Sequence, residues 1–229
     1  MIGIIGAMSV EIEGIQARIE NPEKRVIGGN TFVSGKLCGK DVVAVQCGIG
    51  KVNAALCTQT MILTYQPELI VNSGVGGSLV KELTFGDIAI AKDLVQHDVD
   101  TSPLGDPVGL VSTINKIYFE CDERAVRLID QIVTDMDGVS GMIGTIASGD
   151  QFIASSARKD WITEHFNAVS CEMEGGAIAQ VCAVAGVKCA VIRAISDNAD
   201  DESHMDYGQF VKMAAERSIE VLMRLLSVY

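Results

Sequence analysis

Short apolar runs that end at glycine or turn residues alternate along this chain with segments of helical periodicity, and this alternation limits the folds available to it. Several runs are continuously apolar, which is typical of strands covered on both faces. The alternation predicts a layered α/β fold with a largely parallel central sheet. Strands are predicted at residues 2–5, 31–37, 41–46, 69–72, 87–91 and 187–194, and helices at 9–19, 52–65, 122–134, 173–185 and 210–226.

Local signals predict several of the connections. Cys38-Gly39 should form the turn of a hairpin between the second and third predicted strands. Ser9 is the predicted N-cap of the first helix, and Gly186 the predicted C-cap of the fourth. Residues 103–109 are the best loop candidate. No linker, low-complexity segment or internal repeat divides the chain, so we expect a single domain over residues 1–229.

The charge balance bears on the partners of the chain. A formal net charge of −12 would repel the phosphate backbone of nucleic acids and anionic membrane surfaces, and it suits a small neutral or cationic ligand better. No apolar run approaches the roughly 18–20 residues that cross a bilayer. The N-terminus lacks the basic region of a signal peptide. We therefore expect no nucleic-acid partner, no membrane partner and a cytoplasmic location.

The seven cysteines are scattered and form no C-x-x-C pair, so a zinc site of standard spacing is not expected. Most of them lie in apolar segments, which indicates buried, reduced thiols in a reducing compartment. The sequence predicts neither a metal nor a cofactor.

Glu11 closes the segment G-I-I-G-A-M-S-V-E, which begins in the first predicted strand. This spacing is not the G-x-G-x-x-G of a dinucleotide-binding turn. By its spacing alone, Glu11 is more typical of a surface residue that complements a helix dipole. The alternative is a functional carboxylate at the carboxyl end of a strand, where ligands of α/β proteins usually bind.

Two other segments carry charge within apolar surroundings. Glu172 and Glu174 lie where a strand should pass into a helix, and charged residues are rarely buried there without a partner or a purpose. This favours a functional interpretation. Arg193 lies inside an apolar strand that delivers Asp197 at its end. We expect Arg193 to pair with one of the glutamates, and Asp197 is a candidate acid.

Three glycine-containing segments are weaker signals. C-G-I-G-K at 47–51 lacks the spacing of a P-loop and is typical of a tight turn. N-S-G-V-G-G-S at 72–78 would let a ligand approach the backbone, although a flexible surface turn explains it equally well. In the segment 147–153, the ring of Phe152 could stack on a flat base, and a place in the core is the simpler alternative.

Taken together, these segments resemble the 5'-methylthioadenosine/S-adenosylhomocysteine nucleosidases, a family of the nucleoside phosphorylase superfamily. The resemblance runs from Gly3 to about Phe210. It implies a three-layer α/β/α sandwich with a twisted, mostly parallel (mixed) central sheet, and a homodimer. It also implies hydrolysis of the N-glycosidic bond of 5'-methylthioadenosine and of S-adenosylhomocysteine, as part of methionine salvage. Its specific parts are G-I-I-G-A-M with Glu11, C-G-I-G-K-V at 47–52, S-G-D-Q-F-I at 148–153, E-M-E at 172–174 and R-A-I-S-D at 193–197.

The resemblance also implies roles for individual residues. Asp197 corresponds to the acid that protonates purine N7, Glu11 to the group that activates the attacking water, and Glu174 to the acid that holds the ribose hydroxyls. Phe152 would stack on the base, and the backbone of Ile153 would read the adenine edge. The other implied substrate-binding residues are Met8, Ile49, Val75, Gly76, Glu172, Met173, Arg193, Ser196 and Tyr207, with Thr101 and Leu104 in the 5' pocket of the partner subunit.

The chemistry of glycosidic cleavage agrees with three acids. The purine must leave neutral, so N7 takes a proton, while the ribosyl fragment becomes cationic at C1'. A buried acid of raised pKa can give the proton, a carboxylate on the ribose can stabilise the cation, and a third acid can accept a proton from water. Three acids in different environments are sufficient without a metal.

The chain departs from the family pattern at two places. Val75 stands where a serine usually helps to hold the water, so Glu11, Arg193 and backbone groups would have to hold it. The loop at 97–110 lacks the usual F-G-Y, with Leu104 in place of a phenylalanine and Asp106 in place of an aromatic residue. This second departure leaves the preferred 5' substituent open.

Three alternatives to this function stay open. A purine nucleoside phosphorylase would need cations to hold phosphate, and few basic residues lie near the glycine turns. A 6-amino-6-deoxyfutalosine hydrolase would apply the same chemistry to a different adenine-linked nucleoside. A non-catalytic nucleoside-binding protein of the same fold is disfavoured, because all three acids are present.

Overall fold

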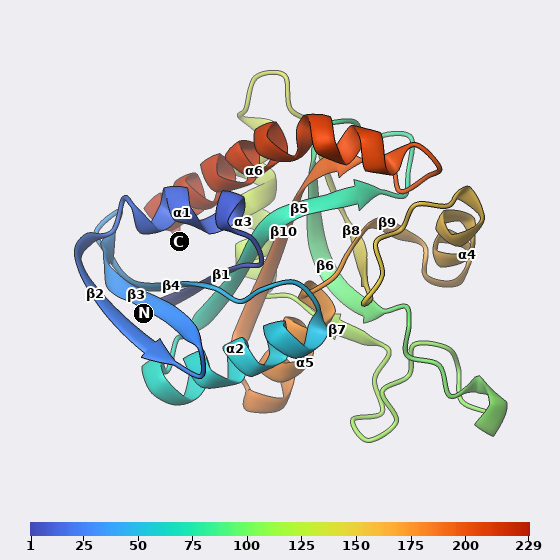
Figure 1. Cartoon of the computed structure of the whole chain (residues 1–229), viewed down its shortest axis with the longest axis horizontal. Helices are drawn as coiled ribbons and strands as arrows, with labels where there is room; N and C mark the ends of the chain where they lie inside the picture. Colours follow the sequence, from blue (N-terminus) through green and yellow to red (C-terminus); the bar gives the residue numbers. More distant parts are fainter.

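The computed structural model describes all 229 residues and has one mixed sheet at its centre, with helices on both sides (Figure 1). The strands are β1 (Ile2–Gly6), β2 (Glu20–Ile27), β3 (Asn30–Leu37), β4 (Lys40–Gln46), β5 (Leu69–Ser78), β6 (Ile88–Gln96), β7 (Tyr118–Glu120), β8 (Gly141–Ser148), β9 (Ala168–Glu172) and β10 (Lys188–Asp197). The helices are α1 (Ser9–Gln16), α2 (Lys51–Tyr65), α3 (Glu123–Thr134), α4 (Ser156–Phe166), α5 (Gly175–Ala185) and α6 (Ser203–Val228), with a short 3-10 helix η1 (Ser102–Leu104).

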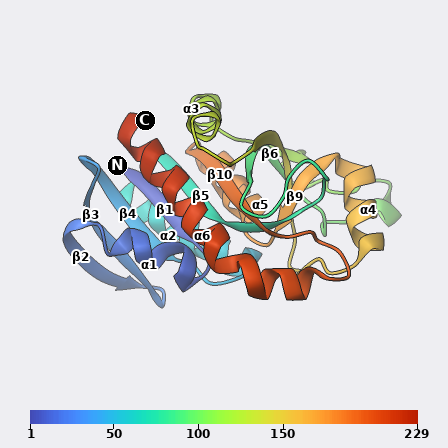
Figure 2. The ribbon, with the colours of Figure 1, turned by 90° about the horizontal axis from the view of Figure 1, so that it is seen from above.

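The helices form two layers. Figure 2 shows α6 crossing the sheet obliquely between α1 and α3. α6 packs over β5 and β10 and contacts both other helices, while α1 lies mainly over β4 and α3 over β6 and β8. Helices α2 and α5 pack against each other on the opposite face. The core between the layers is aliphatic and fully buried, as at Ile4, Val71 and Ile192. Apolar burial on both faces explains why the central strands are continuously apolar in sequence. None of the helices combines the length and the apolarity that a bilayer crossing requires.

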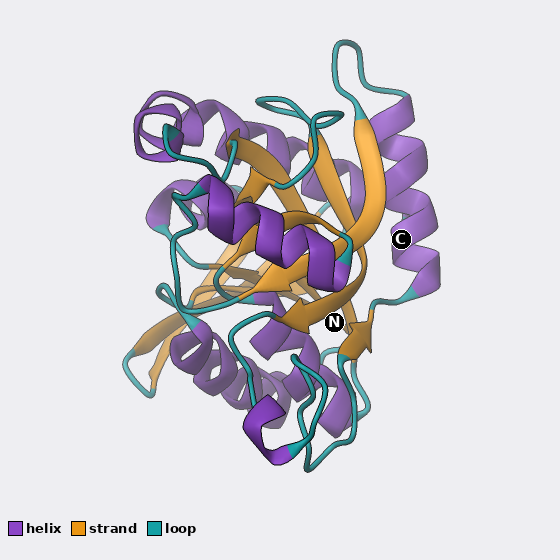
Figure 3. Cartoon of the chain, turned by 90° about the vertical axis from the view of Figure 1, so that its right-hand side faces the viewer, coloured by secondary structure: helices purple, strands orange, loops and turns teal.

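The sheet closes partly on itself, and this closure forms the cavity end of the molecule. β5 pairs with β10, β10 with β6, β6 with β8, β8 with β9, and β9 returns to β5. Figure 3 shows the curved orange strands enclosed by purple helices. β1, β5 and β10 are parallel to one another, whereas β9 runs antiparallel to β5 and overlaps it only at Gly77 and Ser78. The carboxyl ends of β5 and β9 therefore meet, and residues from distant parts of the chain converge there.

Most of the local predictions are confirmed. β3 and β4 form the expected hairpin, in which Cys38 and Gly39 have φ of 52° and 74°. Gly186 caps α5 with φ of 69°, the left-handed conformation that glycine adopts without strain. The prediction for Ser9 was wrong. Ser9 is the first helical residue of α1, the N-cap is Met8, and the helix ends at Gln16.

Some elements were not predicted, or were predicted too short, because their sequences lack a clear apolar period. β2 is exposed throughout except for a half-buried Ile27, and the polar helix α4 has the same weakness. β7 and β8 were also missed, whereas β9 was expected only as a strand of unstated length that ends near Glu172. β5 continues through the glycines to Ser78 with every residue buried, so the flexible-turn alternative for 72–78 was wrong. Helix α6 begins at Ser203, seven residues before its predicted start at 210.

Candidate active site

A cavity of about 500 Å³ lies where the carboxyl ends of β1, β5, β9 and β10 converge, covered by the first turns of α6. Its walls include Glu11, Glu174 and Asp197, so the three acids that the sequence singled out share one cleft. The other predicted site residues on its wall are Met8, Ile49, Val75, Gly76, Phe152, Ile153, Glu172, Met173, Ser196 and Tyr207.

Glu11 is buried, with only 4% of its surface exposed, so the surface alternative for this residue was wrong. Its Oε2 accepts hydrogen bonds from the backbone N–H groups of Ala7 (2.8 Å) and Met8 (2.9 Å), and its Oε1 accepts one from Val75 (3.0 Å). Burial raises the pKa of Glu11, although Arg193 and these N–H groups oppose the shift. Glu11 thus caps the first turn of α1 while it faces the cavity.

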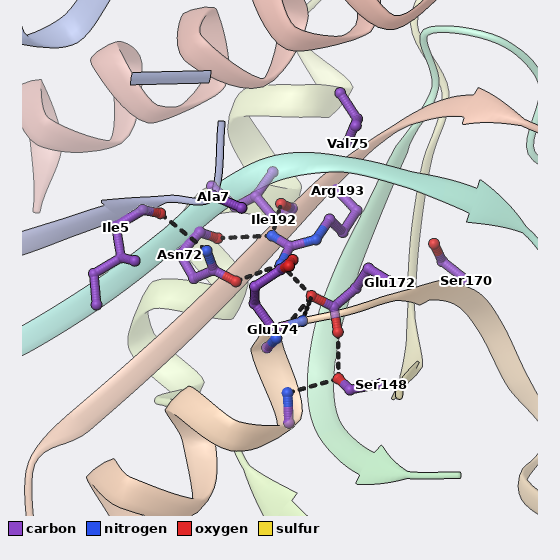
Figure 4. Close-up of polar contacts among 12 residues, drawn as sticks. Ile5, Ala7, Asn72, Val75, Ser148, Ser170, Glu172, Glu174, Ile192 and Arg193 are labelled. Atoms are coloured by element: carbon purple, nitrogen blue, oxygen red, sulfur yellow. Dashed lines mark hydrogen bonds and ion pairs between the residues drawn. The ribbon is translucent and has the colours of Figure 1, made fainter. Parts of the chain in front are cut away.

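Arg193 has 1% of its surface exposed and is not among the residues of the cavity wall. Figure 4 shows its guanidinium directed at Glu172 and Asn72. Its Nη2 donates to Glu172 Oε2 and to Asn72 Oδ1, and its Nη1 donates to the carbonyl of Ile192 at 2.9 Å. The predicted pairing of Arg193 with a glutamate is confirmed, and the partner is Glu172. The buried guanidinium therefore supplies positive charge under the acids.

Glu172 uses most of its hydrogen-bonding capacity within the protein. Besides Arg193, its Oε2 accepts the backbone N–H groups of Glu174 (3.0 Å) and Gly175 (2.7 Å), and its Oε1 accepts the Ser148 hydroxyl (Figure 4). Burial opposes its ionisation, but Arg193 and these donors outweigh burial and lower the pKa of Glu172. Glu172 therefore carries the charge that pairs with Arg193, and it anchors the start of α5.

Glu174 has the opposite electrostatic character. Burial and the neighbouring Glu172 charge raise the pKa of Glu174 to about 7. Its Oε1 accepts the backbone N–H of Gly50 at 2.8 Å, across the cavity from the turn after β4. A single arginine cannot neutralise both glutamates, and Glu174 is the one that holds a proton near neutral pH.

Asp197 ends β10 on the other side of the cavity. Its Oδ1 accepts the backbone N–H of Ala199 at 3.0 Å, and its Oδ2 accepts the Ser196 hydroxyl at 3.0 Å. Burial raises the pKa of Asp197 despite these bonds. A Cβ at Gly77 would come within 2.7 Å of Asp197 Oδ1, so the glycine leaves the space that the carboxyl group occupies.

Aromatic and apolar side chains form the rest of the wall. Phe152 is 47% exposed, so its place is the cavity mouth and the core alternative was wrong for this ring. The Phe152 and Tyr207 rings meet edge to face with centroids 5.6 Å apart. The Tyr207 hydroxyl donates to Met8 Sδ at 3.1 Å, and this contact links α6 to the turn after β1. Ile153 also lines the cavity, and its buried side chain belongs to a small core cluster.

Thr101 and Leu104 lie away from this cavity. The Thr101 hydroxyl donates to Asp106 Oδ2 at 2.8 Å, and Leu104 is 84% exposed. Within one chain, neither residue contributes to the wall.

The cavity also has lining residues that the sequence did not single out, namely Ala7, Gly77, Gln151, Cys171 and His204. The first four are neighbours of predicted site residues, so adjacency was the available signal. His204 had none, because it reaches the wall only through the early start of α6. No lysine or arginine lines the cavity, and no group of three or more His, Cys, Asp or Glu residues could hold a metal ion.

Comparison with known proteins identifies the class of this fold and cavity. A family model described as the phosphorylase superfamily matches residues 1–227, and the chain belongs to that superfamily. It is 38% identical over 226 residues to a 5'-methylthioadenosine/S-adenosylhomocysteine nucleosidase of Shewanella halifaxensis, a match that covers 98% of each protein. Within the superfamily, the chain therefore belongs to the 5'-methylthioadenosine/S-adenosylhomocysteine nucleosidases.

Two further similarities bear on the substrate. The chain is 40% identical over 222 residues to an aminodeoxyfutalosine nucleosidase of Helicobacter pylori, covering 96% of this chain and 95% of that protein. The crystal structure of the Neisseria meningitidis 5'-methylthioadenosine/S-adenosylhomocysteine nucleosidase in complex with methylthio-immucillin-A superposes with a TM-score of 0.96 at 33% identity. That match covers 100% of this chain and 99% of the other.

Proposed function

We propose that this chain hydrolyses the N-glycosidic bond of 5'-methylthioadenosine and S-adenosylhomocysteine, releasing adenine and the 5-thio-substituted ribose. The observation that carries the proposal is one cavity of nucleoside size with three buried acids of different environment on its wall. Membership of the nucleosidase family supports the same reaction. The whole chain would act as one domain in this role.

Asp197 is the proposed general acid for purine N7. Its raised pKa keeps a proton available, and the two hydrogen bonds to its oxygens fix the direction of the carboxyl group. A neutral purine is a far better leaving group than its anion, so protonation at N7 must accompany cleavage of the C1'–N9 bond. The edge of Phe152 meets Tyr207, and its face would stack on the base while the backbone of Ile153 reads the adenine edge.

Glu174 is the proposed ligand of the ribose hydroxyls, beside Met173. Hydroxyl donors from the 2' and 3' positions would favour the ionised carboxylate, so binding should displace the proton that Glu174 holds in the free protein. The resulting negative charge then lies near the cation that develops at C1'. Glu172 and Arg193 support this step by holding the Glu174 backbone rather than by touching the sugar.

Glu11 is the proposed base for the attacking water. Three backbone N–H groups orient its carboxylate, and its raised pKa suits proton acceptance. Val75 offers no hydroxyl, but its backbone N–H already engages Glu11 at 3.0 Å. Glu11 and backbone groups would therefore hold the water, with Arg193 acting only through its charge.

The cavity favours water over phosphate as the nucleophile. Phosphorolysis requires cationic donors at the anion, and no lysine or arginine lines this cavity. Arg193 is buried, and its guanidinium donors face Glu172, Asn72 and Ile192. A non-catalytic binding role is also disfavoured, because a simple binding site would not need three buried acids with perturbed pKa values.

We also propose a homodimer. Val52, Leu56 and Leu63 are 69%, 64% and 71% exposed, and their spacing places them on one face of α2, with exposed Val184 on the adjacent α5. Burial of this face against a second copy would allow Thr101 and Leu104 to approach the 5' end of the partner's cavity. Met8, Ile49 and Tyr207 would supply the rest of that 5' wall.

A role in methionine salvage in the cytoplasm is part of this proposal. All seven cysteines are unpaired and six of them are buried, which agrees with a reducing compartment.

The direct test is adenine release from 5'-methylthioadenosine, followed by absorbance with and without inorganic phosphate. We expect release that is independent of phosphate and yields free 5-methylthioribose. A requirement for phosphate, or formation of a ribose 1-phosphate, would make the chain a phosphorylase. Competition with S-adenosylhomocysteine and 6-amino-6-deoxyfutalosine ranks the substrates, and a kcat/KM much larger for the futalosine compound would overturn the proposed preference.

A further inference from the structure

Asp98 lies just beyond β6 and outside the cavity wall, yet it joins two segments that form that wall. Its Oδ1 accepts a hydrogen bond from the Lys51 ammonium group at 2.6 Å, and its Oδ2 accepts one from the backbone N–H of Asp150 at 2.9 Å. Lys51 begins α2, after the turn that carries Ile49. Asp150 precedes Phe152 in the turn after β8. One carboxylate therefore connects the two turns.

A second contact returns from Asp150 to the first turn. Asp150 Oδ1 accepts the backbone N–H of Lys51 at 2.7 Å, which closes a loop of interactions between the two turns. Gly50, the preceding residue, has φ of 96°, and a Cβ there would stand 3.0 Å from Asp150 Oδ1. The close approach and the positive φ both favour glycine.

These contacts between the two turns extend to Glu174, the proposed ligand of the ribose hydroxyls. With Lys51 held, the N–H of Gly50 points across the cavity and donates to Glu174 Oε1 at 2.8 Å. The same N–H lowers the proton affinity of Glu174 against the effect of burial. The Gly50 turn thus influences both the orientation and the charge of Glu174.

The contacts at Asp98 are sheltered from solvent. The side chains of Lys51 and Asp98 are each 16% exposed, so their attraction is screened less than that of a surface pair. Partial burial raises the pKa of Asp98, but the hydrogen bonds from Lys51 and Asp150 outweigh it, and the pKa lies below its ordinary value. Asp98 is therefore a carboxylate at neutral pH and can accept both donors.

We propose that Asp98 is a positioning residue for the substrate, which fixes the turns 48–51 and 149–153 against each other and thereby aligns Glu174 with the sugar and Phe152 with the base. The inference rests on the proposed function, because it assigns Glu174 to the ribose and Phe152 to the adenine. Asp98 itself touches neither group.

The test compares Asp98→Asn with Asp93→Asn in the full-length protein. The amide at position 98 keeps the shape but has one acceptor oxygen for two donors. Asp93 is a matched control: its side chain is 18% exposed, and it lies on β6, five residues before Asp98. It links β6 to β8 by accepting the Thr145 hydroxyl at 2.7 Å, away from the cavity. Lys51→Met removes the other half of the pair and serves as a second variant if Asp98→Asn folds poorly.

Hydrogen exchange in the unliganded protein reports on the two turns without any assumption about the substrate. We expect the amides of residues 48–51 and 149–153 to exchange roughly tenfold faster in Asp98→Asn, which corresponds to loss of one hydrogen bond to a charged group. Asp93→Asn should leave these amides unchanged. Unchanged exchange in both Asp98→Asn and Lys51→Met would overturn the proposal.

Steady-state kinetics on 5'-methylthioadenosine then test the positioning role. We expect KM to rise and kcat to fall in Asp98→Asn, with kcat/KM reduced about tenfold or more, and little change in Asp93→Asn. Partial unfolding would lower only the apparent kcat, so the rise in KM identifies misalignment. Faster exchange with unaltered kinetics would refute positioning. If the wild-type protein releases no adenine, the proposed function fails, and the exchange result still decides whether Asp98 holds the two turns.

Discussion

At the residue scale, the site is governed by one buried cation among several acids. Arg193 pairs with Glu172, which lowers the pKa of Glu172 and leaves Glu174 with a pKa of about 7. Neighbouring carboxylates in one cleft thereby acquire pKa values shifted in opposite directions, so that Glu172 is ionised at neutral pH while Glu174 is partly protonated. Glu172 accepts the backbone N–H groups at the start of α5. Glu174 can lose its proton when its carboxylate accepts hydrogen bonds from the hydroxyls of a ligand.

Replacement of Asp197 tests the proposed proton donor. Asp197→Asn keeps the size of the side chain and can still accept a hydrogen bond from Ala199 N–H, but it cannot protonate N7. We expect kcat to fall by about 10²- to 10⁴-fold while the affinity for 5'-methylthioadenosine stays within a few-fold. Adenine release and calorimetric binding measure the two effects, and near-normal turnover would remove Asp197 from this role.

Glu174 makes a prediction about stability and pH. Its pKa of about 7 lies above the ordinary 4.5, so the folded state binds this proton more tightly than the unfolded state does. The stabilisation is complete below pH 4.5 and is lost as the pH rises through 7. Glu174→Gln has no such proton to lose. Its free energy of unfolding, measured relative to that of the wild type, should therefore increase by about 3 kcal/mol between pH 4.5 and 8.

Urea unfolding at both pH values measures that difference for Glu174→Gln. Glu123→Gln on the exposed face of α3 is the control for removal of one negative charge, and it should show no comparable trend. A difference for Glu174→Gln that stays constant with pH would show that Glu174 has an ordinary proton affinity in the folded protein.

At the scale of elements, the carboxyl end of β5 combines strand pairing with very close side-chain approach. Gly74 pairs with Arg193 of β10, and a Cβ there would lie 2.5 Å from Glu11 Oε1. Three backbone N–H groups fix that carboxylate, so it cannot move aside without loss of hydrogen bonds. The glycine is required by the acid rather than by a turn.

Gly74→Ala should therefore displace Glu11 and lower kcat by tenfold or more, with a smaller effect on the affinity for substrate. Gly208→Ala in α6 is the matched control, because a Cβ there meets nothing within 4 Å. That control should retain activity and gain about 0.5–1 kcal/mol in stability from the helix propensity of alanine. Thermal unfolding and adenine release distinguish the two, and normal activity in Gly74→Ala would contradict the steric argument.

At the scale of the whole molecule, the exposed apolar face of α2 predicts the association state. Leu56→Glu places a charge in the proposed interface and should convert the dimer to a monomer with a lower kcat/KM, since the 5' wall would be incomplete. Light scattering after size exclusion measures the mass. Val26→Glu on the edge strand β2, where Val26 is 73% exposed, is the control and should remain dimeric. A monomeric wild-type protein would refute the proposed dimer.

The sequence could predict what depends on local periodicity and backbone geometry. Alternating apolar runs and helical segments gave the layered fold, and Cys38-Gly39 and Gly186 marked their turns correctly. The residue types of the cavity could also be predicted, because acids within apolar segments stand out. β2 and α4 could not be found in this way, since exposed polar elements lack the apolar period that identifies a strand or helix.

The tertiary structure alone decided which of these residues meet. Glu11 lies 64 positions from Val75, and the two meet because β1 pairs with β5. Gly50 lies 124 positions from Glu174, and the two meet because β4, β1, β5 and β9 are successive neighbours in the sheet. Strand neighbours likewise place Arg193 of β10 against Glu172 of β9, and the pairing of β6 with β8 places Asp98 beside Asp150. Local patterns determine how each segment folds, whereas proton affinities and contacts in the cleft depend on which strands become neighbours.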